Sequence, residues 1–255
     1  MENFSNYSKD ERNDYKVSAP ESGVFTGEKT LENAGAASRQ LMTKVYGWMC
    51  AALAITAVTA MLCSSSQSLM EMIFGTNIFF WGLLIVEFGL VVAISGMIDR
   101  LSLSTATLLF ILYSVVNGLT LSVIFVAYTQ SSIASTFFIT AGMFGATALY
   151  GAVTKKDLSG WGSFLFMALI GLIIAGVVNI FWQNSVFDFI VSAIGVLIFV
   201  GLTAYDSQAI KNMLAEADDS GSELFQKVAL LGSLKLYLDF VNMFLYLLRF
   251  FGNRR

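Results

Sequence analysis

The sequence contains no histidine, one proline and two cysteines, and only 13% of its 255 residues are charged. Without histidine there is no serine-histidine or cysteine-histidine nucleophile pair, no HExxH zinc site and no imidazole that titrates near neutral pH. Glycine-rich phosphate-binding motifs are missing as well. We therefore predict that the protein is not an enzyme and needs no cofactor, and that any proton switch must use carboxylates.

The small numbers of basic residues and cysteines also argue against nucleic-acid binding and against a disulfide within the chain. Lysine and arginine number 15 against 18 acidic residues, and no basic cluster indicates a nucleic-acid binder. Cys50 and Cys63 lie in one apolar stretch, where a helix separates them by about 20 Å. They cannot form a disulfide with each other there.

Hydrophobic residues, in contrast, make up 56% of the chain, above the roughly 45–50% of soluble domains. Several stretches are long enough to cross a bilayer of about 30 Å as helices, and their Gly, Ser and Thr content suits close helix packing. We predict an all-α membrane protein, a seven-transmembrane helical bundle without strands. The predicted spans are Val45–Cys63, Ile78–Ile98, Ala106–Tyr128, Ile133–Val153, Phe164–Trp182, Phe187–Tyr205 and Val228–Phe251.

The first forty residues differ from the rest, because they are polar, carry both signs of charge and include Pro20. We predict a disordered cytoplasmic tail over residues 1–40 and a transmembrane domain over residues 41–255. The start of the chain does not have the basic, apolar and small-residue pattern of a secretory signal.

The basic residues that flank the spans predict the orientation. The tail and the loops after the second, fourth and sixth spans contain lysine or arginine, whereas the loops after the first, third and fifth contain none. The positive-inside rule then places the N-terminus in the cytoplasm. Strict alternation puts the C-terminus outside, yet it carries Arg254 and Arg255. The seventh span therefore either crosses fully or is short and re-entrant.

Ionisable residues within the spans are the candidate functional residues, because a charge at membrane depth costs several kcal/mol unless it is paired or solvated. They are Glu87 in the second span, Asp206 at the end of the sixth, and Lys235 and Asp239 in the seventh, with Arg100 following the second. In one interpretation Asp206 and Asp239 share a proton and Arg100 compensates the second charge. In the other, Asp206 is an ordinary surface acid and Asp239 pairs with Lys235 on its own helix.

Contact between the two aspartates needs an adjustment of the spans, since Asp239 lies about 16 Å deeper than the start of a helix at Val228. Either the segment before Asp239 projects into the cytoplasm, or the sixth helix continues past Asp206 toward Leu214.

Two other functional classes can be compared with the same residues. Tyr205 and Asp206 match the YD pair of intramembrane aspartyl proteases, but the partner GxGD motif is missing before Asp239. A secondary transporter is disfavoured because no inverted repeat with interrupted helices is visible.

Four segments, in this order among seven spans, resemble the transmembrane Bax inhibitor motif family in its bacterial branch. The resemblance extends from about Arg39 to Gly252, and its motifs are NGLTLSVIF from Asn117, TKKDLS from Thr154, LTAYDSQAIK from Leu202 and LYLDFVNMFLYLLRFFG from Leu236. It implies six helices around a central seventh, in a multi-pass protein of the bacterial inner membrane. The implied function is a pH-sensitive calcium leak channel.

The resemblance also implies roles for individual residues. Asp206 and Asp239 would form the pH sensor, Arg100 would latch the closed state, and Glu87 would belong to the ion path. Asp206 and Asp239 are also the candidate Ca²⁺ ligands, with Ca²⁺ as the transported ion. Lys235 departs from the pattern and is a candidate modulator of the pair. The alternative function is a non-conducting regulator that binds a membrane protease or another membrane complex.

Overall fold

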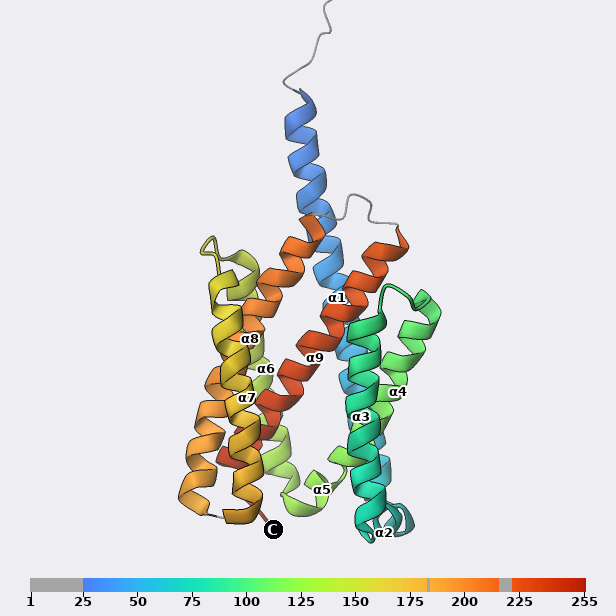
Figure 1. Ribbon diagram of the computed structural model, residues 1–255, viewed down its shortest axis with the longest axis vertical. Coiled ribbons are helices and arrows are strands. Elements are labelled where there is room, and N and C mark those ends of the chain that lie inside the picture. Colours follow the sequence, from blue (N-terminus) through green and yellow to red (C-terminus); the bar gives the residue numbers. More distant parts are fainter. Residues whose placement is uncertain (1–24, 183, 216–221) are drawn as a thin grey trace, which may run out of the picture. The chain divides into compact units, whose positions relative to one another are not determined.

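The computed structural model describes residues 25–182, 184–215 and 222–255, and within them it is almost entirely helical (Figure 1). Apart from one isolated bridge between Tyr128 and Arg254, these residues contain no β-structure. The all-α prediction is therefore confirmed. The helices are α1 (Phe25–Ser64), α2 (Gln67–Phe74), α3 (Asn77–Met97), α4 (Leu103–Leu121), α5 (Val123–Ala127), α6 (Gln130–Val153), α7 (Ser159–Trp182), α8 (Ser185–Ala215) and α9 (Glu223–Phe251).

Among the described residues, seven helical segments are long and apolar enough to cross a membrane, and each overlaps one of the seven predicted spans. Several of them begin at a side-chain cap, such as Ser102 for α4, Thr129 for α6 and Ser222 for α9. These hydroxyl groups accept hydrogen bonds from backbone N–H groups that have no partner within the helix. The short helices α2 and α5 do not form spans of their own. Helix α2 lies between the first and second spans, and α5 forms the end of the third span.

Helix α1 begins at Phe25, so residues 25–40 are helical although they were predicted to belong to a disordered tail. The physical reason lies in their composition, because the segment after Gly27 contains Ala, Leu, Glu and Lys and no proline. Residues 1–24 of the predicted tail lie outside the described residues.

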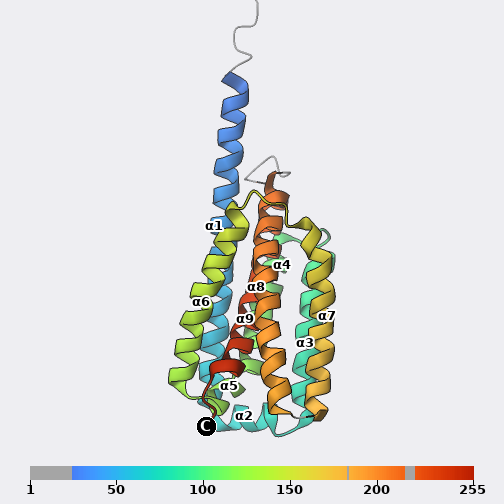
Figure 2. The ribbon, with the colours of Figure 1, turned by 90° about the vertical axis from the view of Figure 1, so that its left-hand side faces the viewer.

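Helix α9 is the centre of the bundle. In the most apolar stretch of α9, 67% of the residues are buried, compared with 6% in that of α3 and 11% in that of α7. Its contacts extend to α4, α6 and α8, and in Figures 1 and 2 it runs obliquely between α3 and α4 on one side and α6, α7 and α8 on the other. Since lipid covers the outer helices, burial within the protein is greatest at the centre. The central seventh helix that the resemblance implied is confirmed.

The end of the chain settles how the seventh helix crosses. Beyond α9 the N–H of Arg255 donates to the carbonyl of Ala127 at 3.0 Å, and the N–H of Thr129 donates to the carbonyl of Asn253 at 3.2 Å. These partners flank the start of α6, so the tail lies at the end of the bundle that also holds α2 and α5 (Figure 1). Helix α9 therefore crosses fully and is not re-entrant. We call this end the C-terminal end of the bundle.

Small residues allow two close helix contacts. A Cβ atom on Gly118 would lie 2.7 Å from the carbonyl oxygen of Thr56, so α4 approaches α1 closely there. A Cβ on Gly151 would overlap the carbonyl of Ala204, so α6 approaches α8 in the same way. Both cysteines are free. The small residues thus act as packing contacts between membrane helices.

Candidate functional site

An ion pair joins the two helices that carry the predicted sensor. The Nζ of Lys235 on α9 lies 3.5 Å from Oδ1 of Asp206 on α8, and the Asp206 side chain is only 13% exposed. Helix α8 continues to Ala215, nine residues past Asp206, which places that carboxylate roughly 13 Å from the helix end. Continuation of the sixth helix past Asp206, one of the two adjustments considered for bringing the aspartates together, is therefore observed.

Asp239 lies one turn after Lys235 on α9 and is 5% exposed. Lys235 pairs with Asp206 across the interface of α8 and α9 and lies one turn from Asp239 on the same helix face, so the three side chains form one charged group. The Oδ2 atom of Asp239 is buried and has no hydrogen-bond partner among the described residues. A buried carboxylate oxygen without a donor is costly when ionised. The structure thus brings together Asp206, Lys235 and Asp239, which we call the carboxylate cluster.

This geometry contradicts the interpretation in which Lys235 pairs with Asp239 and Asp206 is a surface acid. Lys235 contacts Asp206 across the helix interface instead. The spacing of four residues places Lys235 and Asp239 on the same face of α9, and that face packs against α8. The ammonium group therefore reaches the neighbouring helix, where Asp206 is largely buried.

Arg100 is exposed, at the turn that follows α3. No ion pair connects it with Asp206 or Asp239 in the described part of the chain. Its role as a latch stays a prediction about another state of the protein. Likewise, the described residues include no group of three or more acidic or cysteine side chains arranged for a metal ion, and the Ca²⁺ site on the two aspartates stays a prediction.

Glu87 lies at the edge of a second polar group on the opposite side of α9. Its Oε2 accepts a hydrogen bond from Nδ2 of Asn117 on α4 at 3.3 Å, and Asn117 Oδ1 accepts one from the hydroxyl of Tyr237 at 2.9 Å. The Tyr237 hydroxyl is also 2.7 Å from the hydroxyl of Thr56, which donates to the carbonyl of Ser114. This hydroxyl–amide network connects α1, α3, α4 and α9.

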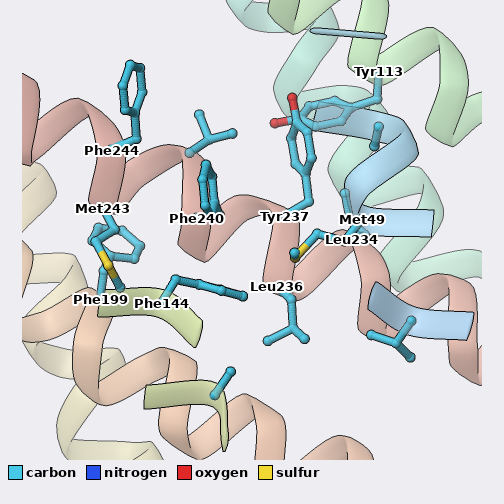
Figure 3. Packing of buried hydrophobic residues seen from close by; sticks show 14 of the residues in the cluster. Met49, Tyr113, Phe144, Phe199, Leu234, Leu236, Tyr237, Phe240, Met243 and Phe244 are labelled. Carbon is cyan, nitrogen blue, oxygen red and sulfur yellow. The ribbon is translucent and has the colours of Figure 1, made fainter. Parts of the chain in front are cut away.

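Tyr237 and Thr56 were missed by the sequence reasoning, although Tyr237 is completely buried. Figure 3 shows its ring extending from α9 toward Tyr113, while Leu236 leaves the helix on the other side. The available signal was a tyrosine in the middle of an apolar span, since a buried phenol usually needs a hydrogen-bond partner.

The motifs around Asp206 also fix the neighbouring loop. Gln208 accepts a hydrogen bond from the N–H of Leu158 and donates one to the carbonyl of Lys156, both at 2.7 Å. Lys211 donates to the carbonyl of Ala152 at the end of α6. The TKKDLS and YDSQAIK segments, far apart in sequence, therefore form one packed unit next to the carboxylate cluster.

Comparison with known proteins shows the family of the chain. Residues 38–255 match the family described as inhibitor of apoptosis-promoting Bax1. The chain belongs to the Bax inhibitor-1 family. Among its relatives, the inner membrane protein YbhL of Escherichia coli K12 is 51% identical over 214 residues, which cover 84% of this chain and 92% of that protein. An uncharacterised protein of Borreliella burgdorferi is 48% identical over 216 residues, covering 85% and 93% of the two chains.

The Bax inhibitor-1 match includes every helix of the bundle from α2 to α9 together with the spanning part of α1. An uncharacterised membrane protein of Streptococcus pyogenes is more distant, at 34% identity over 215 residues, 84% of this chain and 92% of that protein. The apolar helices and the inner membrane relative together identify this chain as a multi-pass inner membrane protein.

Proposed function

We propose that this Bax inhibitor-1 family protein is a pH-gated leak pathway for Ca²⁺ or another cation. The observation that supports it is the carboxylate cluster, in which two acids and one lysine meet across the interface of α8 and α9. The N-terminus would face the cytoplasm, as the basic loops predict.

The cluster is suited to switching because its charges do not balance when both acids are ionised. With one shared proton the cluster contains one carboxylate and one ammonium group and is neutral. Loss of that proton gives a net charge of −1 at a place where Asp239 has an oxygen without a donor. The repulsion weakens the contact between α8 and α9, so deprotonation opens the pathway and protonation closes it.

Other charged groups around the cluster contribute less. Lys211 on α8 is engaged with a backbone carbonyl of α6, and the exposed Arg100 has no ion pair with a described residue in this arrangement. Lys235 is therefore the cation that sets the balance of the cluster. Glu87, on the other side of α9, would provide a second acidic position along the cation path, since one of its carboxylate oxygens is buried without a partner.

The test is Ca²⁺ flux into liposomes that contain the purified protein and an internal indicator, measured from pH 6 to pH 8. We expect flux to rise with pH, and we expect the double substitution Asp206→Asn and Asp239→Asn to abolish that dependence. Asp99→Asn serves as the matched control, because Asp99 is an exposed acid at the end of α3.

An unchanged pH profile in the double variant would contradict the sensor assignment. Absence of any flux from correctly folded wild-type protein would contradict conduction itself. It would instead favour a non-conducting regulator of a membrane protease or another membrane complex, which co-purification from native membranes would then identify.

A further inference from the structure

A second charged cluster lies at the C-terminal end of the bundle, away from the carboxylate cluster. Asp188 in the first turn of α8 forms ion pairs with Arg249 in the last turn of α9, at 3.3 Å, and with Arg254 in the tail, at 3.4 Å. Asn179 near the end of α7 donates from Nδ2 to the same carboxylate at 2.7 Å. Three helices and the tail thus converge on one acid.

These side chains line a cavity of about 690 Å³, which falls in the size range of ligand pockets. Two guanidinium groups against one carboxylate leave the cavity with a net charge of +1. Each arginine contacts Asp188 through one terminal nitrogen, and the guanidinium of Arg254 also lies over the Tyr128 ring, 6.0 Å from its centre. The remaining N–H groups of the two forks can bind an anion. Arg254 is 63% exposed and Arg249 40% exposed, which makes these groups accessible.

Asn179 positions the acid and does not offer a free group to a ligand. Its Nδ2 donates to Asp188, and its Oδ1 is buried out of reach of a ligand in the cavity. The accessible polar groups are therefore the two guanidinium groups, whose forks match the oxygens of a phosphate group.

The surroundings of the cavity indicate where such a ligand comes from. Phe189 lines it and is 54% exposed, and Val186 and Trp182 nearby are 65% and 70% exposed. Exposed aromatic and aliphatic side chains beside arginines are typical of the membrane interface, where headgroups meet acyl chains. A soluble phosphate would not use the apolar flank.

We propose that the cavity between the ends of α7, α8 and α9 binds the phosphodiester headgroup of a glycerophospholipid. Arg249 and Arg254 bind the phosphate, and Asn179 holds Asp188 in place between them. This site is independent of the proposed cation pathway, since none of its residues belongs to the carboxylate cluster.

The experiment uses the full chain in nanodiscs of phosphatidylcholine with or without phosphatidylglycerol, and counts retained lipid by native mass spectrometry. We expect phosphatidylglycerol to be retained and to raise the thermal midpoint, and Arg249→Gln or Arg254→Gln to lower retention about tenfold. Arg255→Gln is the matched control, because it removes the same charge one residue farther along the chain. The Arg255 side chain forms no hydrogen bond or ion pair with a described residue.

Four outcomes would overturn the proposal. Equal losses in Arg254→Gln and Arg255→Gln would indicate general charge attraction, and retention unchanged in all variants would exclude the arginines. If inorganic phosphate or glycerol 3-phosphate stabilises the protein in pure phosphatidylcholine while phosphatidylglycerol is not retained, the source is soluble and not a lipid. Should Arg254→Gln fold poorly, Arg254→Lys keeps the charge and should retain part of the lipid; complete loss of retention in folded Arg254→Lys protein is the fourth.

Discussion

The two faces of α9 carry polar groups of opposite character, only two residues apart. Tyr237 faces α1 and α4 and takes part in the hydroxyl–amide network, where its hydroxyl has partners at 2.7 and 2.9 Å. Asp239 faces α8, where Lys235 contacts Asp206 at 3.5 Å and Oδ2 of Asp239 has no partner among the described residues. One face is hydrogen-bonded at its centre, and the other has an unbalanced charge.

This difference suggests that one face of α9 holds the helix in position and that the other responds to pH in the proposed mechanism. The hydrogen bonds among Tyr237, Thr56 and Asn117 join uncharged groups, and Glu87 is the one carboxylate at the edge of this network. The contacts at its centre therefore do not change between pH 6 and pH 8. In the proposed mechanism the carboxylate cluster changes its charge by one proton, which changes the energy of the contact between α8 and α9. The Tyr237 face would then hold α9 in place while its contact with α8 responds to pH.

The largest expected effect comes from disrupting the hydroxyl–amide network on the Tyr237 face of α9. Tyr237→Phe removes the hydroxyl that joins Thr56 to Asn117 and should lower the free energy of unfolding by about 2 kcal/mol. The pH at half-maximal flux should stay unchanged, because no titrating group of the carboxylate cluster is altered. A titration with sodium dodecyl sulfate, monitored by circular dichroism, measures the free energy of unfolding. The liposome assay measures the pH at half-maximal flux.

Tyr113→Phe is the matched control, since Tyr113 packs against the Tyr237 ring but its hydroxyl has no hydrogen bond to a described group. Equal destabilisation by both substitutions would show that ring packing, and not the network, holds this face. A shift of the pH profile in Tyr237→Phe would show that the two faces are not separate.

The second-largest expected effect concerns the face of α9 that carries the carboxylate cluster. Lys235→Met removes the positive charge that favours ionisation of both aspartates, so the cluster keeps its proton to higher pH. Because deprotonation opens the pathway in our proposal, half-maximal flux should move upward by about one pH unit, equivalent to about 1.4 kcal/mol. Liposome flux across the pH range measures this shift.

Lys227→Met provides the comparison for that variant, because Lys227 pairs with Glu223 in the first turns of α9, far along the helix from the cluster. We expect no shift in it. A downward or absent shift in Lys235→Met would remove the lysine from the sensor.

Much of this arrangement could be predicted from the sequence, and the remainder could not for identifiable reasons. Length and hydropathy predict the seven spans, because lipid imposes a minimum on each apolar run. The partner of Lys235 could not be predicted, because spacing along α9 gives the shared face with Asp239 but not the helix that packs against that face. Whether α8 would continue past Asp206 was equally open, since the residues up to Ala215 mix polar and apolar side chains and suit either a loop or a helix beyond the membrane.

The charged residues that the sequence prediction missed also have their partners on other helices. Asp188 was not considered among the charges within the spans, and its partners Arg249 and Arg254 come from the end of a different helix and from the tail. Opposite charges at the same end of neighbouring spans were the available signal. Their contact depends on the full crossing of α9, which the sequence left undecided.

The smallest expected effect concerns Arg100, and it tests whether the comparison of the two faces holds in a second state. Arg100 is exposed and has no ion pair with a described residue, so Arg100→Gln should change the free energy of unfolding by less than about 0.5 kcal/mol. If Arg100 approaches the carboxylate cluster in the closed state, its loss should raise flux at pH 6 about threefold, since an exposed ion pair contributes up to about 1 kcal/mol. Lys155→Gln, an exposed cation of the loop after α6, should leave flux unchanged. Equal flux in wild type and Arg100→Gln at pH 6 would mean that Lys235 alone balances the two aspartates, and that closure needs no cation from α3.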